Sequence, residues 1–346
     1  CTDSRIRPSY HFTGTVTGRS SAEQPNPQNL PTRKGKHAKT IKNLIRAQQE
    51  PGRQMCLVQG DAKGSEVKWL AILSRDPVMC KVFNDGMEFR REFVANPTSE
   101  NLLRAKIYGD PHRTSGSYAF DVDIKDVTDE QRQNAKSVLL GLMYGRGIQS
   151  IARQLGISEE QAQEIAKAIM GRFEVAGEWL RAQGAFAQDY YYVQGLEGRR
   201  RRLYAFFTRD RQLHAEAGRQ ASNTEIQVTS SDASLIGATL FSDYVEDKNL
   251  PWYIENAVHD SGVVRAPVAD LPRILNVHNH IYTVSTQRYM EKHFGIDFPC
   301  DLEMEYEVSV APVHGWGFMS KWNGSQPDLE RICRLAEFGP NEGEKV

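Results

Sequence analysis

The sequence has few cysteines and no long apolar run, and each absence excludes a class of protein. Its five cysteines are scattered, without a CxxC pair or a Cys/His metal spacing. This pattern argues against a disulfide scaffold and a zinc site. No apolar stretch approaches the ~20 residues that span a membrane, and the first residues do not resemble a signal peptide. We therefore expect no membrane association and a reducing, cytoplasmic setting.

Net charge is also nearly absent, but the charges are unevenly spread. The 346 residues carry a formal charge of −1, yet residues 1–60 contain ten Lys and Arg against three Asp and Glu. The segment around Glu303, Glu305 and Glu307 is acidic instead. Such asymmetry is typical of a protein that holds a phosphate backbone on one side, although charge runs are more often only solvated surface.

One stretch, TDEQRQNAKSVLLGLMYG at residues 128–145, has complete start and stop signals for a helix. Thr128 suits the N-cap and Gln131 completes a capping box. Asp129 and Glu130 lie in the first turn, where the helix dipole favours acids, and Gly145 suits a left-handed C-terminal cap. The sequence therefore predicts a helix with defined ends.

Within this helix, Arg132, Lys136, Leu140 and Tyr144 recur at every fourth position and form one stripe. At ~1.5 Å per residue the stripe is ~18 Å long, comparable to an extended nucleoside triphosphate. Its cations would meet phosphates and its aromatic ring a base. From the spacing alone, an ordinary solvated face beside a core face is the better explanation of the pattern.

The pattern Arg132-x-x-x-Lys136-x-x-x-Leu140-x-x-x-Tyr144-Gly145 resembles the fingers-helix motif of family A DNA polymerases, the group of bacterial DNA polymerase I and its phage relatives. The family usually has Phe or Tyr where Leu140 stands. The resemblance implies that the stripe binds the incoming nucleotide and that Lys136 also acts catalytically, as a proton donor to pyrophosphate.

A second nucleotide contact is implied by Gly109-Asp110-Pro111-His112, which is similar to a family segment whose His reaches the triphosphate. His112 is therefore a candidate nucleotide-binding residue. A lone histidine is as often structural, so both interpretations stay open for it.

The run Met55-Cys56-Leu57-Val58 predicts a buried strand that ends at Gly60-Asp61, before a helix. Taken alone, Asp61 could simply cap that helix. The segment resembles the first catalytic motif of the family, which implies that Asp61 binds both metal ions and that Glu66 excludes ribonucleotides.

Trp252 to Val258 predicts another strand, which ends in His259-Asp260. The Val-His-Asp sequence is similar to the second catalytic motif, with Asp260 as the other metal ligand and His259 as a DNA contact. The family usually has Glu where this chain has Ser261. The implied cofactor is a pair of Mg²⁺ ions, for which Mn²⁺ can substitute, because Mg²⁺ accepts carboxylates together with substrate phosphates.

Two further segments resemble family regions that contact primer-template DNA. The first, TGR…PNPQNLPTR, would otherwise be interpreted as a surface loop, and the second lies on one face of a predicted helix, with GRRRR shortly before it. The implied DNA contacts are Arg19, Asn26, Gln28, Asn29 and Arg33 in the first segment and Arg219, Asn223 and Gln227 in the second.

The resemblance implies an α+β fold: a palm whose antiparallel sheet is backed by helices, and an inserted, mostly helical fingers subdomain. We expect residues 1–75 to form the first part of the palm, 76–215 the fingers and 216–346 the second part of the palm. The last of these ranges has the patterns of a helix at 271–294 and a strand at 303–310. The thumb and the 3′–5′ exonuclease domain are expected to be absent from this chain.

The function implied is template-directed 5′–3′ DNA synthesis, by two-metal nucleotidyl transfer from dNTPs to a primer 3′-OH on primer-template DNA. We expect a longer or split phage-type DNA polymerase, of which this chain is the C-terminal polymerase part, in a bacterial or phage-infected cell. Its partner would be an N-terminal polymerase fragment with the thumb and exonuclease. Cys1 in place of Met fits a fragment of a longer product, or the residue that follows an intein.

Two alternatives stay open at this point. A single-subunit RNA polymerase shares the carboxylates and an Arg/Lys/Tyr helix, but Glu66 and the QNLP segment speak against it. A non-catalytic DNA-binding remnant is suggested by the departures at Leu140 and Ser261.

Overall fold

The computed structural model describes residues 5–11, 14–30, 37–258, 260–312 and 314–338. It divides into two compact units. Unit 1 comprises Cys1–Lys63, Ser231–Met290 and Leu302–Val346, and unit 2 comprises Gly64–Ser230 and Glu291–Asp301. Three separate stretches of sequence therefore build unit 1. The predicted division at residues 75 and 215 stays a prediction.

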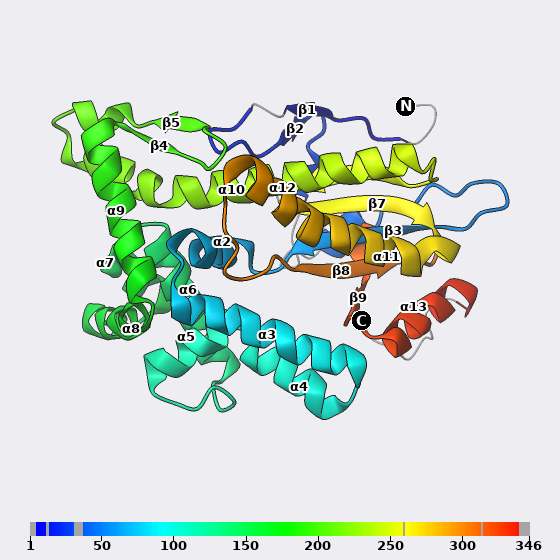
Figure 1. The fold of residues 1–346 in the computed structure, drawn as a ribbon, viewed down its shortest axis with the longest axis horizontal. Helices are drawn as coiled ribbons and strands as arrows, with labels where there is room; N and C mark the ends of the chain where they lie inside the picture. The colour runs from blue at the N-terminus through cyan, green and yellow to red at the C-terminus, as the bar shows by residue number, and fades with distance from the viewer. Residues whose placement is uncertain (1–4, 12–13, 31–36, 259, 313, 339–346) are drawn as a thin grey trace. The chain divides into compact units, whose positions relative to one another are not determined.

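Unit 1 is organised around a five-stranded antiparallel sheet, shown in Figure 1. The central strand β3 (Met55–Ala62) pairs with β7 on one side and β8 on the other. The strand order is β6-β7-β3-β8-β9. The other bounds are β6 Tyr253–Val258, β7 Ser261–Pro267, β8 Met304–Ser309 and β9 Ser320–Trp322. The predicted antiparallel sheet is confirmed, including the strands expected at residues 55, 252 and 303.

Alternation along β3 gives the sheet two differently covered faces. Cys56 and Val58 lie in the larger apolar core, whereas Met55 and Leu57 lie in a smaller core with Trp316 and Met319. Because strand side chains alternate between faces, Asp61 lies on the same face as Met55 and Leu57. Asp61, the catalytic candidate, therefore lies on the face of the sheet that is covered by the smaller core.

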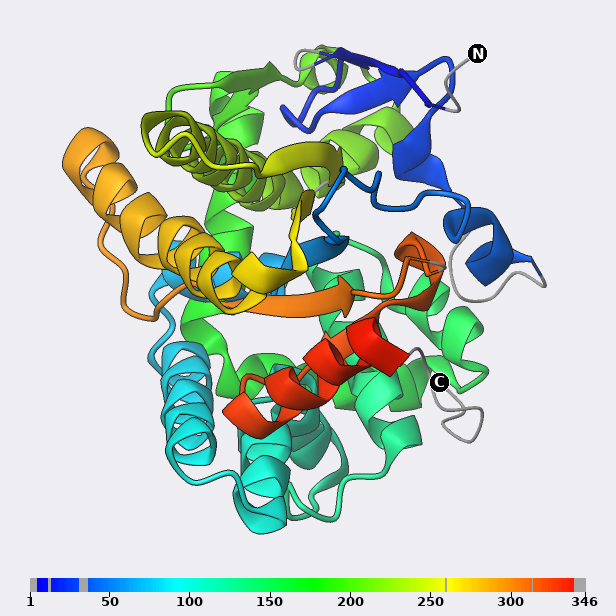
Figure 2. The ribbon, with the colours of Figure 1, turned by 90° about the vertical axis from the view of Figure 1, so that its right-hand side faces the viewer.

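Helices cover the larger core. They are α11 (Leu271–His280), α13 (Gln326–Phe338) and the C-terminal part of α10, represented by Leu275, Ile332 and Phe241. Figure 2 shows α13 in red, and this helix contacts β9. The helix predicted at 271–294 is confirmed, with a π-helical segment Ile281–Ser285 between α11 and α12 (Thr286–Phe294).

The N-terminal region of unit 1 consists of short elements: β1 Ser9–His11, β2 Ser21–Glu23, the 3₁₀ helix η1 Pro27–Asn29 and α1 Ala38–Lys42. β1 and β2 pair with each other. The side chain of Gln28 donates to the carbonyl of Ala257 on β6 at 2.6 Å. The segment is thus attached to the strand that leads into Asp260.

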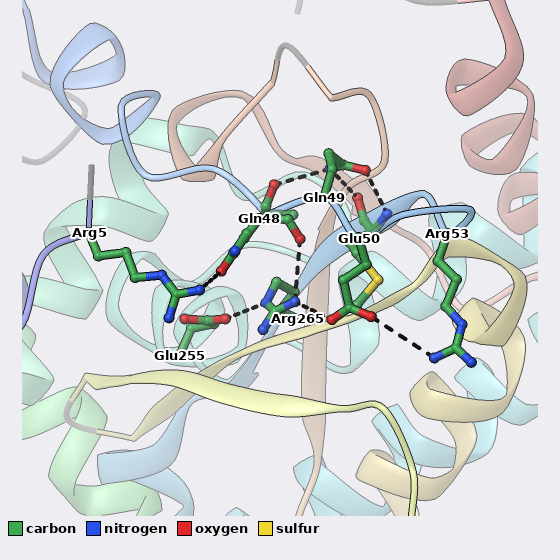
Figure 3. Close-up of polar contacts among 9 residues, drawn as sticks. Arg5, Gln48, Gln49, Glu50, Arg53, Glu255 and Arg265 are labelled. Carbon is green, nitrogen blue, oxygen red and sulfur yellow. Dashed lines mark hydrogen bonds and ion pairs between the residues drawn. The ribbon is translucent and has the colours of Figure 1, made fainter. Parts of the chain in front are cut away.

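An ion-pair network holds the β6–β7 hairpin to the chain before β3 (Figure 3). Arg265 on β7 is only 8% exposed and donates to Glu255 at 2.5 Å and to Glu50 at 2.9 Å. Its guanidinium also lies 4.1 Å from the ring centre of Tyr253. Arg5 joins the network through Gln48 at 2.5 Å. A buried arginine with two carboxylate partners fixes the hairpin whose turn contains Asp260.

Unit 2 is mostly helical, as expected for the region of residues 76–215. Its helices are α2 Ser65–Ser74, α3 Pro77–Ala95, α4 Ser99–Tyr108, α5 Pro111–Phe120, α6 Asp129–Met143, α7 Ile148–Leu155, α8 Glu159–Arg172 and α9 Glu174–Tyr190. Asp76 caps α3 and accepts from the Ala176 backbone at 3.1 Å, so one buried carboxylate joins α3 to α9.

A small hairpin and a long helix follow α9. The strands β4 (Tyr192–Gln194) and β5 (Arg200–Arg202) pair antiparallel. The 3₁₀ helix η2 (Tyr204–Phe207) leads into α10 (Arg211–Asp247), of which residues 211–230 belong to unit 2. A small apolar cluster joins hairpin and helix through Val193, Leu203 and Ala217.

Candidate active site

Asp61 lies at the end of β3, where the strand leads into a turn before α2. In the sheet register it is opposite Ser261 on β7 and Glu305 on β8. Residues directly opposite each other in a sheet share one face. Asp61 is exposed, so its carboxylate is accessible from solvent.

Asp260 lies beside it, in the turn between β6 and β7. The backbone N–H of Ala62 donates to the Asp260 carbonyl at 3.2 Å, which places the two catalytic candidates in neighbouring positions. Ser261, which stands where the family usually has Glu, donates its hydroxyl to the Val258 carbonyl at 3.0 Å. Its side chain therefore closes the turn, and Asp61 and Asp260 lie in neighbouring positions in the fold.

Two more carboxylates lie on this face, from Glu305 and Glu307 of β8. Glu305 accepts from Lys321 at 2.6 Å. Partial loss of hydration, followed by repulsion from the negative charges of Asp260, Glu305 and Glu307, raises the pKa of Asp61 to about 7, against the opposite effect of Lys321. The site is thus a cluster of acids whose mutual repulsion is not balanced by the positive charge of Lys321.

A divalent cation suits this donor set because it would relieve the repulsion that raises the pKa of Asp61. Within the ranges that the structure describes, no three His, Cys, Asp or Glu side chains are grouped to enclose an ion. Mg²⁺ tolerates such a set, since it keeps waters and accepts one or two carboxylates together with substrate phosphates. Asp61 and Asp260 fit that mode of binding.

In unit 2, α6 has the ends that the sequence predicts. Thr128 is the N-cap with a full capping box to Gln131, and Gly145 follows the helix with a φ of 63°. Val138 and Leu139 on one side of the helix are buried. Arg132, Lys136, Leu140 and Tyr144 are all partly buried and form the stripe on another side.

The cationic end of the stripe is close to α5. Asp110 caps α5 through the His112 N–H and also accepts from Arg132 Nε at 2.5 Å. Burial, together with the positive charges of Lys136 and Arg132, lowers the pKa of His112 to about 4 against the opposing effect of Asp110. His112 is therefore neutral at pH 7, and its Nδ1 has no hydrogen-bond partner among the described residues.

At the other end of the stripe, the Tyr144 hydroxyl donates to Glu66 Oε2. This contact brings together two residues that the sequence assigns to sugar and base recognition. The hydrogen bond holds the Glu66 carboxylate at the C-terminal end of α6 and also fixes the ring of Tyr144.

The predicted DNA contacts of unit 1 differ in accessibility. Asn29 is exposed and Arg19 partly so, whereas Gln28 is buried and its amide nitrogen donates to Ser20 and Ala257. Asn26 caps η1 through its side-chain oxygen. The remaining two candidates, Arg33 and His259, lie outside the described residues.

Arg219, Asn223 and Gln227 lie on α10, as predicted. Arg219 is exposed and Asn223 is partly buried, with an Oδ1 that has no hydrogen-bond partner within the described ranges. A Cβ at Gly145 would approach the Arg219 backbone to 2.9 Å, so only glycine lets the end of α6 pack this closely against α10. The end of α6 and α10 therefore share a tight contact within unit 2.

A family model described as DNA polymerase family A matches residues 1–311. The chain belongs to DNA polymerase family A. The DNA polymerase of Bacillus phage SP01 is 28% identical over 361 residues, which cover 97% of this chain and 36% of the phage protein. The DNA polymerase I of Caldicellulosiruptor bescii is 26% identical over 303 residues, 87% of this chain and 31% of that protein.

A solved structure is similar as well. The POL domain of Pol1 from M. smegmatis, in complex with DNA primer-template and dNTP, matches with a TM-score of 0.76 and 25% identity. The match covers 92% of this chain and 49% of that one. The chain spans about a third of the length of the curated relatives named above. No helix in the described part of this family A member is long and apolar enough to cross a membrane.

Three residues near the candidate site were missed as site residues. Glu305 and Glu307 recur with the period of two expected for one strand face, a signal that could have placed them beside Asp61. Asp110 accepts a hydrogen bond from Arg132, and the two residues come together only in the folded chain. The two residues are 22 positions apart and lie on different helices, so no local sequence pattern predicts their contact in this family A chain.

Proposed function

We propose that this chain is the C-terminal polymerase part of a longer or split, phage-type family A enzyme, possessing template-directed 5′–3′ DNA polymerase activity. The observation that carries the proposal is the acid cluster around Asp61 and Asp260, combined in one family A chain with the Arg132–Lys136 cations of α6. Its substrates are dNTPs and primer-template DNA. An N-terminal fragment with thumb and exonuclease is the proposed partner, in the cytoplasm of a bacterial or phage-infected cell.

The proposed cofactor is Mg²⁺, with Mn²⁺ as a substitute. Two such ions, when bound, stabilise the charge that develops on the attacking and leaving oxygens of a phosphoryl transfer. Asp61 and Asp260 would hold them at the end of β3. Ser261 adds no carboxylate there, so we expect weaker metal binding than a Glu at this position would give.

In unit 2, Arg132 and Lys136 would neutralise the triphosphate, and Lys136 would give a proton to the pyrophosphate as it leaves. Asp110 positions the Arg132 guanidinium by accepting from its Nε. Neutral His112 can donate a hydrogen bond to a phosphate oxygen. Because it is uncharged, it does not compete with Arg132 for an ion pair with Asp110. Leu140 offers an apolar side chain where the stripe meets the sugar.

Glu66 would exclude ribonucleotides, because its carboxylate is kept in one position by the Tyr144 hydroxyl. Tyr144→Phe keeps the ring and removes that hydrogen bond. We expect this variant to extend primers with dNTPs and to accept rNTPs more readily than the parent chain. Glu66→Ala should relax the discrimination further.

Primer extension tests the proposal. A primed template is incubated with Mg²⁺ and either dNTPs or rNTPs, with the chain alone and with a supplied N-terminal polymerase fragment. Extension by dNTPs that is lost in Asp61→Asn and Asp260→Asn, but retained in the exposed control Asp243→Asn, supports the proposal. Extension by rNTPs alone would indicate an RNA polymerase, and DNA binding without extension under either condition would indicate a remnant.

A further inference from the structure

Two cysteines, Cys80 and Cys300, meet inside unit 2, although the chain passes through unit 1 between them. Cys80 lies on α3, and Cys300 lies in the segment Glu291–Asp301, which belongs to unit 2. The two residues are 6% and 2% exposed. Their side chains are free thiols that share a hydrogen bond. Neither residue belongs to the proposed metal, nucleotide or DNA sites.

Hydrogen bonds on both sides of Cys300 hold it against α2 and α3. The side chain of Asn84 on α3 donates to the Pro299 carbonyl at 2.9 Å. Lys68 Nζ on α2 donates to the Asp301 carbonyl at 2.8 Å. Both chain neighbours of Cys300 are therefore attached to these helices, so the backbone on each side keeps its thiol in place.

A third hydrogen bond connects Cys80 to α2. Its S–H donates to the Ala71 carbonyl at 3.4 Å, which leaves the Cys80 sulfur to accept from the S–H of Cys300. Accepting this bond lowers the pKa of Cys80, whereas donating it, together with burial, raises the pKa of Cys300. Because the thiolate is the reactive form, Cys80 is the thiol that reacts first.

The burial of both thiols selects a small oxidant. Hydrogen peroxide is uncharged and close to water in size, so a limited local opening of unit 2 is enough to admit it. In a reducing compartment a disulfide is transient, which suits a redox-sensing pair better than a permanent link.

We propose that Cys80 and Cys300 form a peroxide-sensitive dithiol, which oxidation converts into a disulfide that joins α3 to the segment Glu291–Asp301. The Cys80 sulfur attacks one peroxide oxygen, the O–O bond breaks, and the other oxygen leaves as water with the Cys80 proton. The Cys300 sulfur then attacks the resulting sulfenic acid, the S–O bond breaks, and a second water leaves with the Cys300 proton. Two thiols are oxidised to one disulfide, and the peroxide is reduced to two waters.

The disulfide has a consequence for unfolding that does not depend on the proposed function. It closes a loop of roughly 220 residues, and a link across so long a loop removes much of the freedom of the unfolded chain. Thiols already in contact need little backbone movement to form the bond, so the folded chain gains little strain. The oxidised chain should therefore be harder to unfold than the reduced one.

Peroxide treatment of the full chain, followed by unfolding, alkylation and peptide mapping, tests the proposal. The untreated parent should take up the alkylating reagent at every cysteine, and the treated parent at two fewer. Mass spectrometry of the unreduced digest should find two peptides joined through Cys80 and Cys300, and dithiothreitol should separate them. Persistence of both residues as alkylated thiols would overturn the proposal, and so would a link from either one to another cysteine.

Single replacements test the order of reaction. In Cys300→Ser no thiol can attack the sulfenic acid, so dimedone should label Cys80 at least about 10-fold more than in the parent. Equal labelling would contradict the proposed order. Cys80→Ser should leave Cys300 without label. Cys56→Ser and Cys333→Ser, matched controls in unit 1, should form the Cys80–Cys300 link as the parent does.

Urea unfolding gives an independent measurement. The midpoint of the oxidised parent should exceed that of the reduced parent, and dithiothreitol should restore the lower value. Cys80→Ser, treated in the same way, should show no increase. A lower midpoint after oxidation would mean that the bond forms only in a distorted chain, which would also overturn the proposal. The mapping uses the parent chain, so it decides even if circular dichroism shows that a serine variant is unfolded.

Discussion

Replacing Asp61 with Asn removes a carboxylate from the acid cluster and should stabilise the metal-free protein. The pKa of Asp61 is raised from 3.8 to about 7, so its charged form is disfavoured in the folded chain. A difference of about three pH units corresponds to about 4 kcal/mol as an upper bound. Because Asp61 is exposed, solvent screening reduces this to about 1–2 kcal/mol. We expect Asp61→Asn to raise the apparent free energy of unfolding by that amount at pH 8.

The pH dependence follows from the direction of the shift. Between about pH 4 and pH 7 the folded state binds more protons at Asp61 than the unfolded state, so the parent chain loses stability as the pH rises. Asn cannot ionise and shows no such loss. The advantage of Asp61→Asn should therefore be absent at pH 4, grow towards pH 7 and stay constant above it.

Urea unfolding in EDTA, followed at pH 4, 6 and 8, measures the effect. Asp243→Asn, an exposed replacement on α10, is the matched control and should change the free energy of unfolding by less than about 0.5 kcal/mol. Mg²⁺ should then reverse the order of stability at pH 8, because only the parent chain keeps both ligands. If the Asp61→Asn variant is no more stable than the parent at pH 8 in EDTA, the claim that the folded chain disfavours the charged form of Asp61 is refuted.

Three other replacements test how the framework is held. Asp76→Ala removes the carboxylate that caps α3 and accepts from the Ala176 N–H, and should lower the free energy of unfolding in urea by about 2–4 kcal/mol. Asp76→Asn keeps one acceptor oxygen and should lower it by less than half of that. Gly145→Ala should cost about 2–3 kcal/mol and raise the KM for dNTPs, because φ is 63° and a Cβ would meet α10. Arg265→Met removes this partner from Glu255 and leaves Glu50 with the more distant Arg53, at 4.0 Å. It should lower the unfolding free energy by about 1–3 kcal/mol, whereas an unchanged value would show that the network is dispensable.

Much of the fold could be predicted from local signals. The apolar run before Asp61 and the capping box of α6 are short-range features, and the structure has both where expected. The pairing of Asp61 with Asp260 came from the family motifs, since neither Gly-Asp nor His-Asp is informative alone. The individual roles of the site residues stay predictions.

Other features depend on contacts between distant residues. β5 consists of three arginines, a composition that disfavours a strand, and it forms because the turn at Gly198 pairs it with β4. β1 and β2 are three residues each and too short for a periodic signal. The partners of Arg265 lie 10 and 215 residues away in sequence, so no local pattern could identify them.

The strand order of unit 1 has a consequence for synthesis on the ribosome. The central strand β3 is complete at Ala62, but one of its neighbours, β8, ends at Ser309, roughly 250 residues later. At about 5 to 20 residues per second, β3 keeps at least one edge unpaired for about 12 to 50 s. An apolar strand with open edges is a site for aggregation. The nascent chain should therefore depend on chaperone protection of residues 55–62 until β7 and β8 emerge.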